Sequence, residues 1–396
     1  MDIVLSQAQT LLLAMIVFFV GTYFHSYIYF LKKFNIPEPV IGGLIFALVM
    51  TALYHHSNIN LTLDHEIRDD LMLTFFATVG LNANFSLFKK GGSKLISFLL
   101  VTVLYLFVQN LIGVSMAKAM GIDPLLGMLA GSITLSGGHG TGASYAMKFG
   151  AINGAMEIAL ACATLGLVLG GIIGGPVSEW LIEKHKLAPE NKVLNPDDAL
   201  KEHGFNEPEV VTTSSILQVL LCSFLAIFVG NELYELTTSY NLTIPKFILV
   251  LFVGIILTNL LNTTKNAKLQ QQSIDLVNMI SLSLFLSIAM MSLKLWQLLD
   301  LALPVLAIVA VQAVAMAIFA YHVTFRALGK DYEAATIAGG HCGFGLGATP
   351  TALANIESVT NRYGPSPYGM FVVLMVGAFF IDIANAIVIQ LFLSLI

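Results

Sequence analysis

Two glycine-rich motifs interrupt apolar sequence at corresponding places in the two halves of the chain. The motifs read Ser136-Gly137-Gly138-His139-Gly140-Thr141-Gly142 and Gly339-Gly340-His341-Cys342-Gly343-Phe344-Gly345, and His139 recurs as His341 202 residues later. In hydrocarbon a helix is broken only where the break is buried in protein or lines a watery cavity, because every backbone polar group must be satisfied. Paired breaks in the two halves of a chain are typical of the binding site of a secondary transporter.

The composition agrees with a membrane protein. Apolar residues make up 57% of the chain and charged residues 11%, against roughly 25% charged residues in soluble domains. The net charge of −5 gives no reason to expect a nucleic-acid partner. The three cysteines have no CxxC spacing, so neither a disulfide framework nor a metal knuckle is expected.

Long apolar segments predict an all-α polytopic membrane protein. A spanning helix needs about 20 mostly apolar residues. About ten transmembrane helices are expected, near residues 8–31, 38–55, 69–88, 95–118, 155–180, 214–240, 245–262, 275–299, 303–325 and 368–395. The polar stretch 181–212 divides them five and five, and we interpret it as a solvated linker between repeats at 1–180 and 213–396.

The two halves share further positions in the same order. Ile36-Pro37 corresponds to Ile244-Pro245, and Gln109 corresponds to Gln312. With five spans in each half, the second repeat enters the membrane from the opposite side, which gives inverted repeats. Lysine and arginine favour cytoplasmic loops, and their distribution predicts a cytoplasmic linker and both termini outside.

Each break lies in a segment too short to cross the bilayer before the glycines. Asp123 to Leu135 would give about 20 Å of helix against a hydrocarbon core of about 30 Å. We therefore expect re-entrant hairpin loops at about 119–154 and 327–367. Their tips would approach each other near the middle of the membrane.

A helix that starts at such a tip presents free amide groups and its positive dipole end to an anionic ligand. Glycine allows close approach of backbone to a carboxylate, and hydroxyls add donors. The predicted substrate-binding residues are Ser136, Gly137, Gly138, His139, Gly140, Thr141, Gly142, Gly343, Gly345, Gly347, Thr349 and Thr351. Close helix packing is the competing interpretation, and it suits the four-residue spacing of Gly166, Gly170 and Gly174 better than it suits the two motifs.

Ionisable residues inside spans are costly and often functional. Asp382 lies mid-span, with Asn385 one turn along on the same face. Hard oxygen ligands suit Na⁺, so these two residues, with Asn82 and Asn84, are the predicted Na⁺ ligands. A proton-carrying or structural role for Asp382 stays open, and Glu157 and His341 are further candidates.

The two histidines and the cysteine allow other interpretations. His139 and His341 are interpreted as buried histidines that donate to freed carbonyls, with proton coupling as the alternative. An intramembrane hydrolase using Ser136 with His139, or Cys342 with His341, lacks an orienting acid in either motif. A transporter that is not an enzyme remains the better interpretation.

Several segments together resemble the bacterial sodium/glutamate symporter family. They are 36–40, 75–84, 131–142 and 340–351, including the run Phe75-Phe76-Ala77-Thr78-Val79-Gly80 and the two glycine motifs. The resemblance implies Na⁺-driven uptake of L-glutamate across the bacterial cytoplasmic (inner) membrane, with Na⁺ as the coupling ion and no other cofactor. It also implies a homodimer in the lipid bilayer that moves substrate by an elevator-like displacement. The alternative is a Na⁺- or H⁺-coupled symporter of another carboxylate such as citrate or malate.

Overall fold

The chain forms two compact units, each built from segments of both halves of the sequence. The first unit comprises Met1–Asn84, Gly150–Glu157 and Pro208–Asp300, and the second Phe85–Phe149, Ile158–Glu207 and Leu301–Ile396. The computed structural model describes residues 2–34, 36–57, 60–83, 88–150, 152, 154–189, 210–239, 244–262, 269–293 and 302–396. The predicted repeats at 1–180 and 213–396 are contiguous in sequence, whereas the compact units are not.

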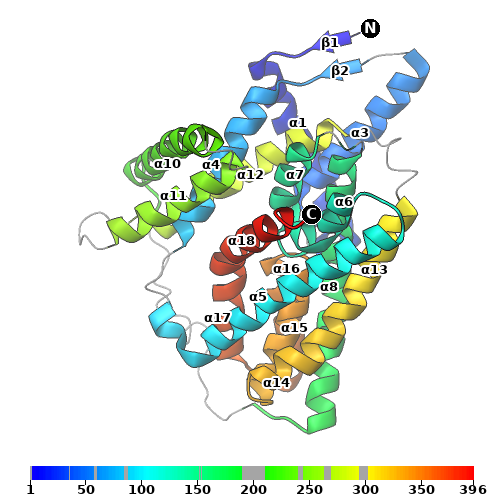
Figure 1. The fold of residues 1–396 in the computed structure, drawn as a ribbon, viewed down its shortest axis with the longest axis vertical. Coiled ribbons are helices and arrows are strands. Elements are labelled where there is room, and N and C mark those ends of the chain that lie inside the picture. The colour runs from blue at the N-terminus through cyan, green and yellow to red at the C-terminus, as the bar shows by residue number, and fades with distance from the viewer. Residues whose placement is uncertain are drawn as a thin grey trace. The chain divides into compact units, whose positions relative to one another are not determined.

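The first unit consists of long helices and one short pair of strands. Its helix α4 packs against α11 and α12, and α1 packs against α3 (Figure 1). Parallel pairing of β1 with β2 is the only departure from helix among its regular elements in the part of the chain that is described. The elements are β1 (Asp2–Val4), α1 (Gln7–Tyr27), α2 (Tyr29–Lys33), α3 (Glu38–Ser57), β2 (Asn60–Thr62), α4 (His65–Asn82), α10 (Thr213–Ser239), α11 (Lys246–Leu261) and α12 (Gln271–Met291).

The second unit contains both glycine motifs. Its helices are α5 (Phe88–Ala119), α6 (Pro124–Met128), α7 (Gly138–Lys148), most of α8 (Ala155–His185), α13 (Ala302–Phe319), α14 (Phe325–Ala327), α15 (Tyr332–Leu346), α16 (Thr349–Tyr363), α17 (Pro367–Met375) and α18 (Ile381–Leu393). In the described part of this unit, three π-helical turns interrupt the α-helices: η2 (Leu129–Ile133), η4 (Ala320–Thr324) and η5 (Val376–Phe380). Such turns occur frequently at functional sites.

Length and composition make this a multi-pass membrane protein. Six helices among the described residues are long and apolar enough to cross a membrane, starting at Gln7, Gly92, Ala155, Thr213, Gln271 and Leu303. Shorter apolar helices cover Glu38–Leu53, Pro124–Ile133, Lys246–Leu261 and Ile381–Leu393. The segment expected as one span at 368–395 is divided into α17, η5 and α18. The expected number of ten spans therefore stays a prediction.

Helices α15 and α16 form an antiparallel hairpin. A Cβ atom built on Gly343 would lie 2.4 Å from the Cα of Ala352, and one on Gly340 would lie 2.9 Å from the Cδ1 of Ile356. At the open end of the hairpin, the Tyr332 hydroxyl donates to the carbonyl of Gly364. The chain thus reverses at Gly347, and not within the second glycine motif, which lies inside α15. The re-entrant character of 327–367 stays a prediction.

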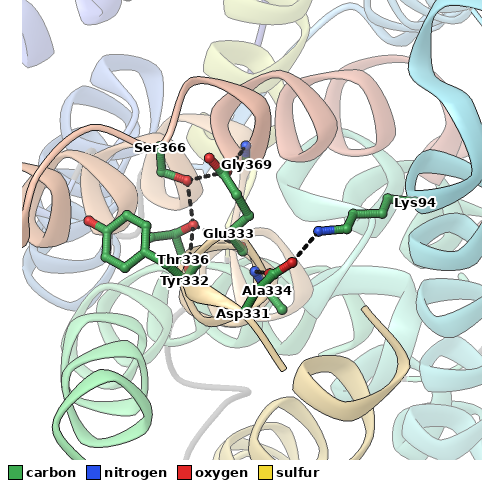
Figure 2. Close-up of polar contacts among 8 residues, drawn as sticks. All are labelled: Lys94, Asp331, Tyr332, Glu333, Ala334, Thr336, Ser366 and Gly369. Atoms are coloured by element: carbon green, nitrogen blue, oxygen red, sulfur yellow. Dashed lines mark hydrogen bonds and ion pairs between the residues drawn. The ribbon is translucent and has the colours of Figure 1, made fainter. Parts of the chain in front are cut away.

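A polar cluster fixes the open end of this hairpin to α17 and α5 (Figure 2). The Glu333 carboxylate accepts hydrogen bonds from the Ser366 hydroxyl and the Gly369 amide, each at 2.5 Å. Asp331 caps α15 through the Ala334 amide and forms an ion pair with Lys94. Burial raises the pKa of the Glu333 carboxyl, whereas its hydrogen bonds with Ser366 and Gly369 act in the opposite direction.

The glycine stripe on α8 brings this helix directly against α15. A Cβ on Gly166 would lie 2.0 Å from the carbonyl oxygen of Leu346, and one on Gly174 would lie 2.0 Å from the Nδ2 of Asn355. That amide donates to the carbonyls of Gly170 and Gly339. The interpretation of Gly166, Gly170 and Gly174 as packing positions is confirmed.

Alanine substitutions on α8 test this packing. Gly166→Ala places a methyl group against backbone that cannot yield, so the thermal unfolding midpoint of the purified protein should fall, by the equivalent of about 1–3 kcal/mol. Gly175→Ala is the matched control because a Cβ there meets nothing within 4 Å. Its midpoint should be unchanged or raised, since alanine favours helix over glycine. Equal effects of the two substitutions would contradict the packing role.

The Glu333 cluster predicts a pH-dependent difference between two variants. Glu333→Ala leaves the Ser366 hydroxyl and the Gly369 amide without their acceptor and should destabilise the protein by about 1–3 kcal/mol. Because the pKa of Glu333 is raised on folding, its contribution to stability is largest at low pH and is lost as pH rises through the folded-state pKa. Glu333→Gln lacks this titration. Melting curves between pH 4 and pH 8 should therefore show that the stability of the Gln variant rises relative to that of the wild type as pH rises. A difference in melting temperature that does not change with pH would contradict the titration of Glu333.

Candidate functional site

The two glycine breaks meet inside the second unit. The Ser136 hydroxyl donates to the Oε1 of Gln109 at 2.6 Å and contacts the carbonyl oxygen of Gly345 at 3.2 Å. The Gln109 amide donates to the same Gly345 carbonyl at 2.7 Å. A Cβ on Gly138 would lie 3.8 Å from the carbonyl oxygen of Gly347. The predicted approach of the two breaks is therefore present in the structure.

The first break opens at Gly131, before the glycine motif itself. Gly131 has φ −109° and ψ −138°, which is not helical, inside the π-helical turn η2. The freed amide of Ser132 donates to the Oδ1 of Asn110 at 3.1 Å, and the Ser132 carbonyl accepts from the Nδ2 of Asn385 at 2.8 Å. The same carbonyl also accepts from the Gly137 amide at 3.0 Å. Asn110, from α5, thus satisfies the freed Ser132 amide, and Asn385, from α18, adds a second donor to the Ser132 carbonyl.

Unpartnered polar atoms remain around Ser132. Among the described residues, the Nδ2 of Asn110, the Oγ of Ser132 and the Oδ1 of Asn385 are buried without a hydrogen-bond partner. Each belongs to a residue that uses its other polar atom at the break. Buried polar groups are nearly always hydrogen-bonded, so this set of donors and acceptors can receive a small polar ligand or an ion.

The helices that follow the two breaks begin without a side-chain cap. Helix α7 starts after Gly137 and α16 starts after Ala348, and neither N-cap side chain accepts a hydrogen bond from the first turn. Gly138 has φ +68°, in the left-handed region that favours glycine. Both helix starts therefore present free amides and a positive dipole end, which suits a carboxylate.

Hydroxyl groups accompany these helix starts. Thr351 is buried, and its Oγ1 has no hydrogen-bond partner in the part of the chain that the structure describes. Thr141 is also buried, whereas Thr349 is half-buried, with its Oγ1 3.1 Å from a Cβ built on Gly377 in η5. The threonines predicted from sequence thus lie on the first turns of α7 and α16.

Asp382 follows the π-helical turn η5. It is half-buried on the first turn of α18, one helical turn from Asn385. Within the described residues, Asp382 has neither a hydrogen bond nor an ion pair. Asn385 approaches the first break closely: its Nδ2 lies 2.9 Å from a Cβ built on Gly137. A carboxylate without a partner and an amide oxygen without a partner are thus one turn apart, which suits a hard cation.

Two further candidate ion ligands from sequence, Asn82 and Glu157, belong to the first unit. The Asn82 side chain accepts from Gln271 at 2.7 Å and donates to Asp275 at 3.4 Å. Glu157 is buried near the start of α8. Asn84 lies outside the described residues. No group of three or more His, Cys, Asp or Glu side chains that could hold a metal was found in the described part of the chain.

The two histidines occupy different environments. The Nε2 of His139 lies 3.1 Å from the hydroxyl of Thr164 on α8. The Nδ1 of His341 lies 2.9 Å from the hydroxyl of Thr324, while its Nε2 is buried without a partner. Both rings thus contact threonine hydroxyls, and not the freed carbonyls that the sequence interpretation assigned to them.

Sequence reasoning missed the role of three side chains that hold the site together, Asn110, Gln109 and Gln312. Asn110 lies in the expected span 95–118, and Gln312 lies in the span 303–325 and donates to the carbonyl of Gln109 at 2.7 Å. Gln109 and Gln312 served only as repeat markers in the sequence. The rule that polar residues inside spans are costly, applied to Asp382 and Asn82, would also have found Asn110.

Long apolar helices and a buried polar site at two broken segments define a multi-pass membrane transporter. Comparison with known proteins agrees: residues 3–365 match the sodium/glutamate symporter family. The chain belongs to this family. Two relatives named sodium/glutamate symporter come from Escherichia coli K12, with 46% identity over 99% of this chain and 98% of the relative, and from Haemophilus influenzae, with 44% identity over 98% and 96%.

Among solved structures, the sodium proton antiporter of Methanocaldococcus jannaschii aligns over 98% of both chains with 12% identity and a TM-score of 0.43.

Two substitutions at the first break should affect stability differently. Asn110→Ala removes the acceptor of the buried Ser132 amide and should lower the free energy of unfolding by about 1–3 kcal/mol. Ser132→Ala removes a hydroxyl that has no partner, so its stability should equal or exceed that of the wild type. Thermal unfolding without added ligand measures both, and a strongly destabilised Ser132→Ala protein would show that its hydroxyl is already satisfied.

Proposed function

We propose that this chain takes up L-glutamate by Na⁺-driven symport. Family membership supports both the substrate and the coupling ion. The observation that carries the proposal in this chain is the meeting of two helix breaks beside uncapped helix starts and an unpartnered carboxylate. Na⁺ is the coupling ion, and the chemistry requires no resident cofactor.

In this proposal the first turns of α7 and α16 bind the carboxylates of glutamate. The ligands are the amides and hydroxyls of the two breaks, at Ser136, Gly137, Gly138, His139, Gly140, Thr141, Gly142, Gly343, Gly345, Gly347, Thr349 and Thr351. Two helix starts can take the two carboxylates of one glutamate. The unpartnered hydroxyl of Thr351 supports a ligand at α16.

Asp382 and Asn385 supply oxygen ligands for Na⁺. The negative charge of Asp382 offsets the positive charge of the ion. The Oδ1 of Asn385 has no described hydrogen-bond partner and can coordinate the ion. Because Asn385 also holds the Ser132 carbonyl, an ion at this position would be linked to the shape of the first break. Asn82, Asn84, Glu157 and His341 remain candidate ligands from sequence.

The finer architecture is part of the same proposal. Ten spans form two inverted repeats at 1–180 and 213–396, joined by a cytoplasmic linker at 181–212. The segments 119–154 and 327–367 are re-entrant, both termini face outward, and the protein works as an elevator-like homodimer in the inner membrane. The antiparallel contacts of α15 with α16 and the hydrogen bond between Gln312 and Gln109 support this arrangement.

Uptake into proteoliposomes tests the proposal. Labelled glutamate should accumulate when an inward Na⁺ gradient is imposed and should not accumulate with a proton gradient alone. Excess unlabelled citrate or malate should leave this uptake unchanged. Accumulation driven by protons, or full competition by citrate, would favour a symporter of another carboxylate.

Asp382→Asn should reduce Na⁺-dependent uptake at least tenfold, because it removes the charge that offsets Na⁺. The protein should still fold in membranes, since Asp382 has no described partner to lose. Glu357→Gln is the matched control, as it removes a carboxylate on an exposed face of α16 in the same unit. Normal uptake with normal Na⁺ dependence in the Asp382 variant would remove this residue from the mechanism.

A further inference from the structure

A cavity of about 240 Å³ lies between the end of α8 and the segment formed by η4 and α14, apart from the glycine breaks. Cationic and aromatic residues line it: Lys184, His185, Tyr321, Phe325, Arg326 and Lys330. None of the described residues that line it is acidic. The electrostatic character of the cavity therefore favours an anion.

The acidic side chains nearest in sequence are occupied elsewhere. Glu179 and Glu183 both pair with Arg362, and Glu183 also accepts from the Tyr363 hydroxyl. Asp331 pairs with Lys94. Among the described residues, Lys184, Arg326 and Lys330 form no ion pair. Their positive charges are therefore available to an anionic ligand.

Aromatic residues mark this end of α8 as a membrane interface. Trp180 stacks on Tyr321 with ring centroids 4.4 Å apart, and 56% of Trp180 is exposed. The Nζ of Lys184 donates to the Tyr321 hydroxyl at 2.7 Å and lies 5.2 Å from the centre of the Trp180 ring. Trp and Tyr are enriched where the bilayer meets water, so the cationic cavity lies at headgroup depth.

Two exposed apolar stripes lead to the cavity. On α8, Ile172, Pro176 and Trp180 are exposed at four-residue steps, and Lys184 follows at the next step. The helix α13 and its continuation present a second stripe of this kind, formed by Val314, Ile318, His322 and Arg326. Residues four apart lie on one face of a helix. Each stripe thus runs from apolar surface to a cationic side chain.

We propose that this cavity binds the phosphate headgroup of an anionic phospholipid, whose acyl chains lie along the two stripes. Basic pockets between transmembrane helices recognise such headgroups. A free phosphate ion would be attracted by the same charges but would gain nothing from the exposed apolar stripes or from the stacked Trp180. An anionic lipid is therefore the ligand that can interact with both the cationic cavity and the exposed apolar stripes.

Lipid retention by the purified full-length protein tests this site. Native mass spectrometry after incubation with phosphatidylglycerol or phosphatidylcholine counts the bound lipids. Phosphatidylglycerol should be retained preferentially. The triple variant Lys184→Gln/Arg326→Gln/Lys330→Gln should bind it about tenfold more weakly, because each basic residue adds to attraction for anionic lipid.

The control variant Lys32→Gln/Lys33→Gln/Lys118→Gln removes the same charge from exposed positions elsewhere and should retain phosphatidylglycerol normally. Arg326 is exposed. If the triple variant does not fold, Arg326→Gln alone should still bind phosphatidylglycerol several-fold more weakly than the wild type. Equal retention by the wild type and the cavity variants would overturn the proposal, as would equal retention of the two lipids. Thermal stabilisation by inorganic phosphate as large as that by phosphatidylglycerol would indicate a site for a free anion and would also overturn it.

Discussion

The second unit depends on how backbone groups are satisfied where its helices break. At the first break the Ser132 amide is held by Asn110, and the Ser132 carbonyl by Asn385. At the second break the Gly345 carbonyl is held by Gln109. In a membrane interior an unsatisfied backbone group costs several kcal/mol. Helices α5 and α18 must therefore lie beside the breaks, and their positions fix the rest of the site.

The side chains that bond to the broken backbone still have polar atoms that form no hydrogen bond in the described structure. Asn110, Asn385 and Gln312 each bond through one polar atom and leave the other buried without a partner. A buried unsatisfied group costs about 1–3 kcal/mol, and no hydrogen bond of these atoms in the described structure offsets this cost. In the proposed symporter, the ion and the substrate supply the missing partners. Binding would then also stabilise the broken segments, which links occupancy to the conformation of the breaks.

The sequence predicted a break near each motif, the approach of the two breaks and the packing role of Gly166, Gly170 and Gly174. All three follow from local composition, because glycine motifs and four-residue spacing are visible without a partner. The sequence placed the second break within Gly339–Gly345, whereas that motif lies inside α15 and the chain breaks after it, at Gly347. The role of Asn110 was not predicted, since its partner is the backbone of Ser132, 22 residues away. The turn η5 was invisible too, because a π-helical turn has the same apolar composition as the α-helix around it. Compact units that combine both halves cannot be inferred from segments that are contiguous in the chain.

Residues at corresponding positions of the two halves make different contacts. Gln109 holds the second break, whereas Gln312 donates to the backbone of Gln109. His139 contacts Thr164 on α8, whereas His341 contacts Thr324 and packs against Phe98, Tyr105 and Phe344. The recurring motif therefore has a different place in each half: the first motif begins α7 after a break, whereas the second lies inside α15, before the break at Gly347. In the proposed symporter both helix starts bind carboxylates of glutamate, and Asn385 links the Na⁺ site to the first break. Unequal surroundings thus allow Na⁺ to bind beside the first break while both breaks receive the substrate.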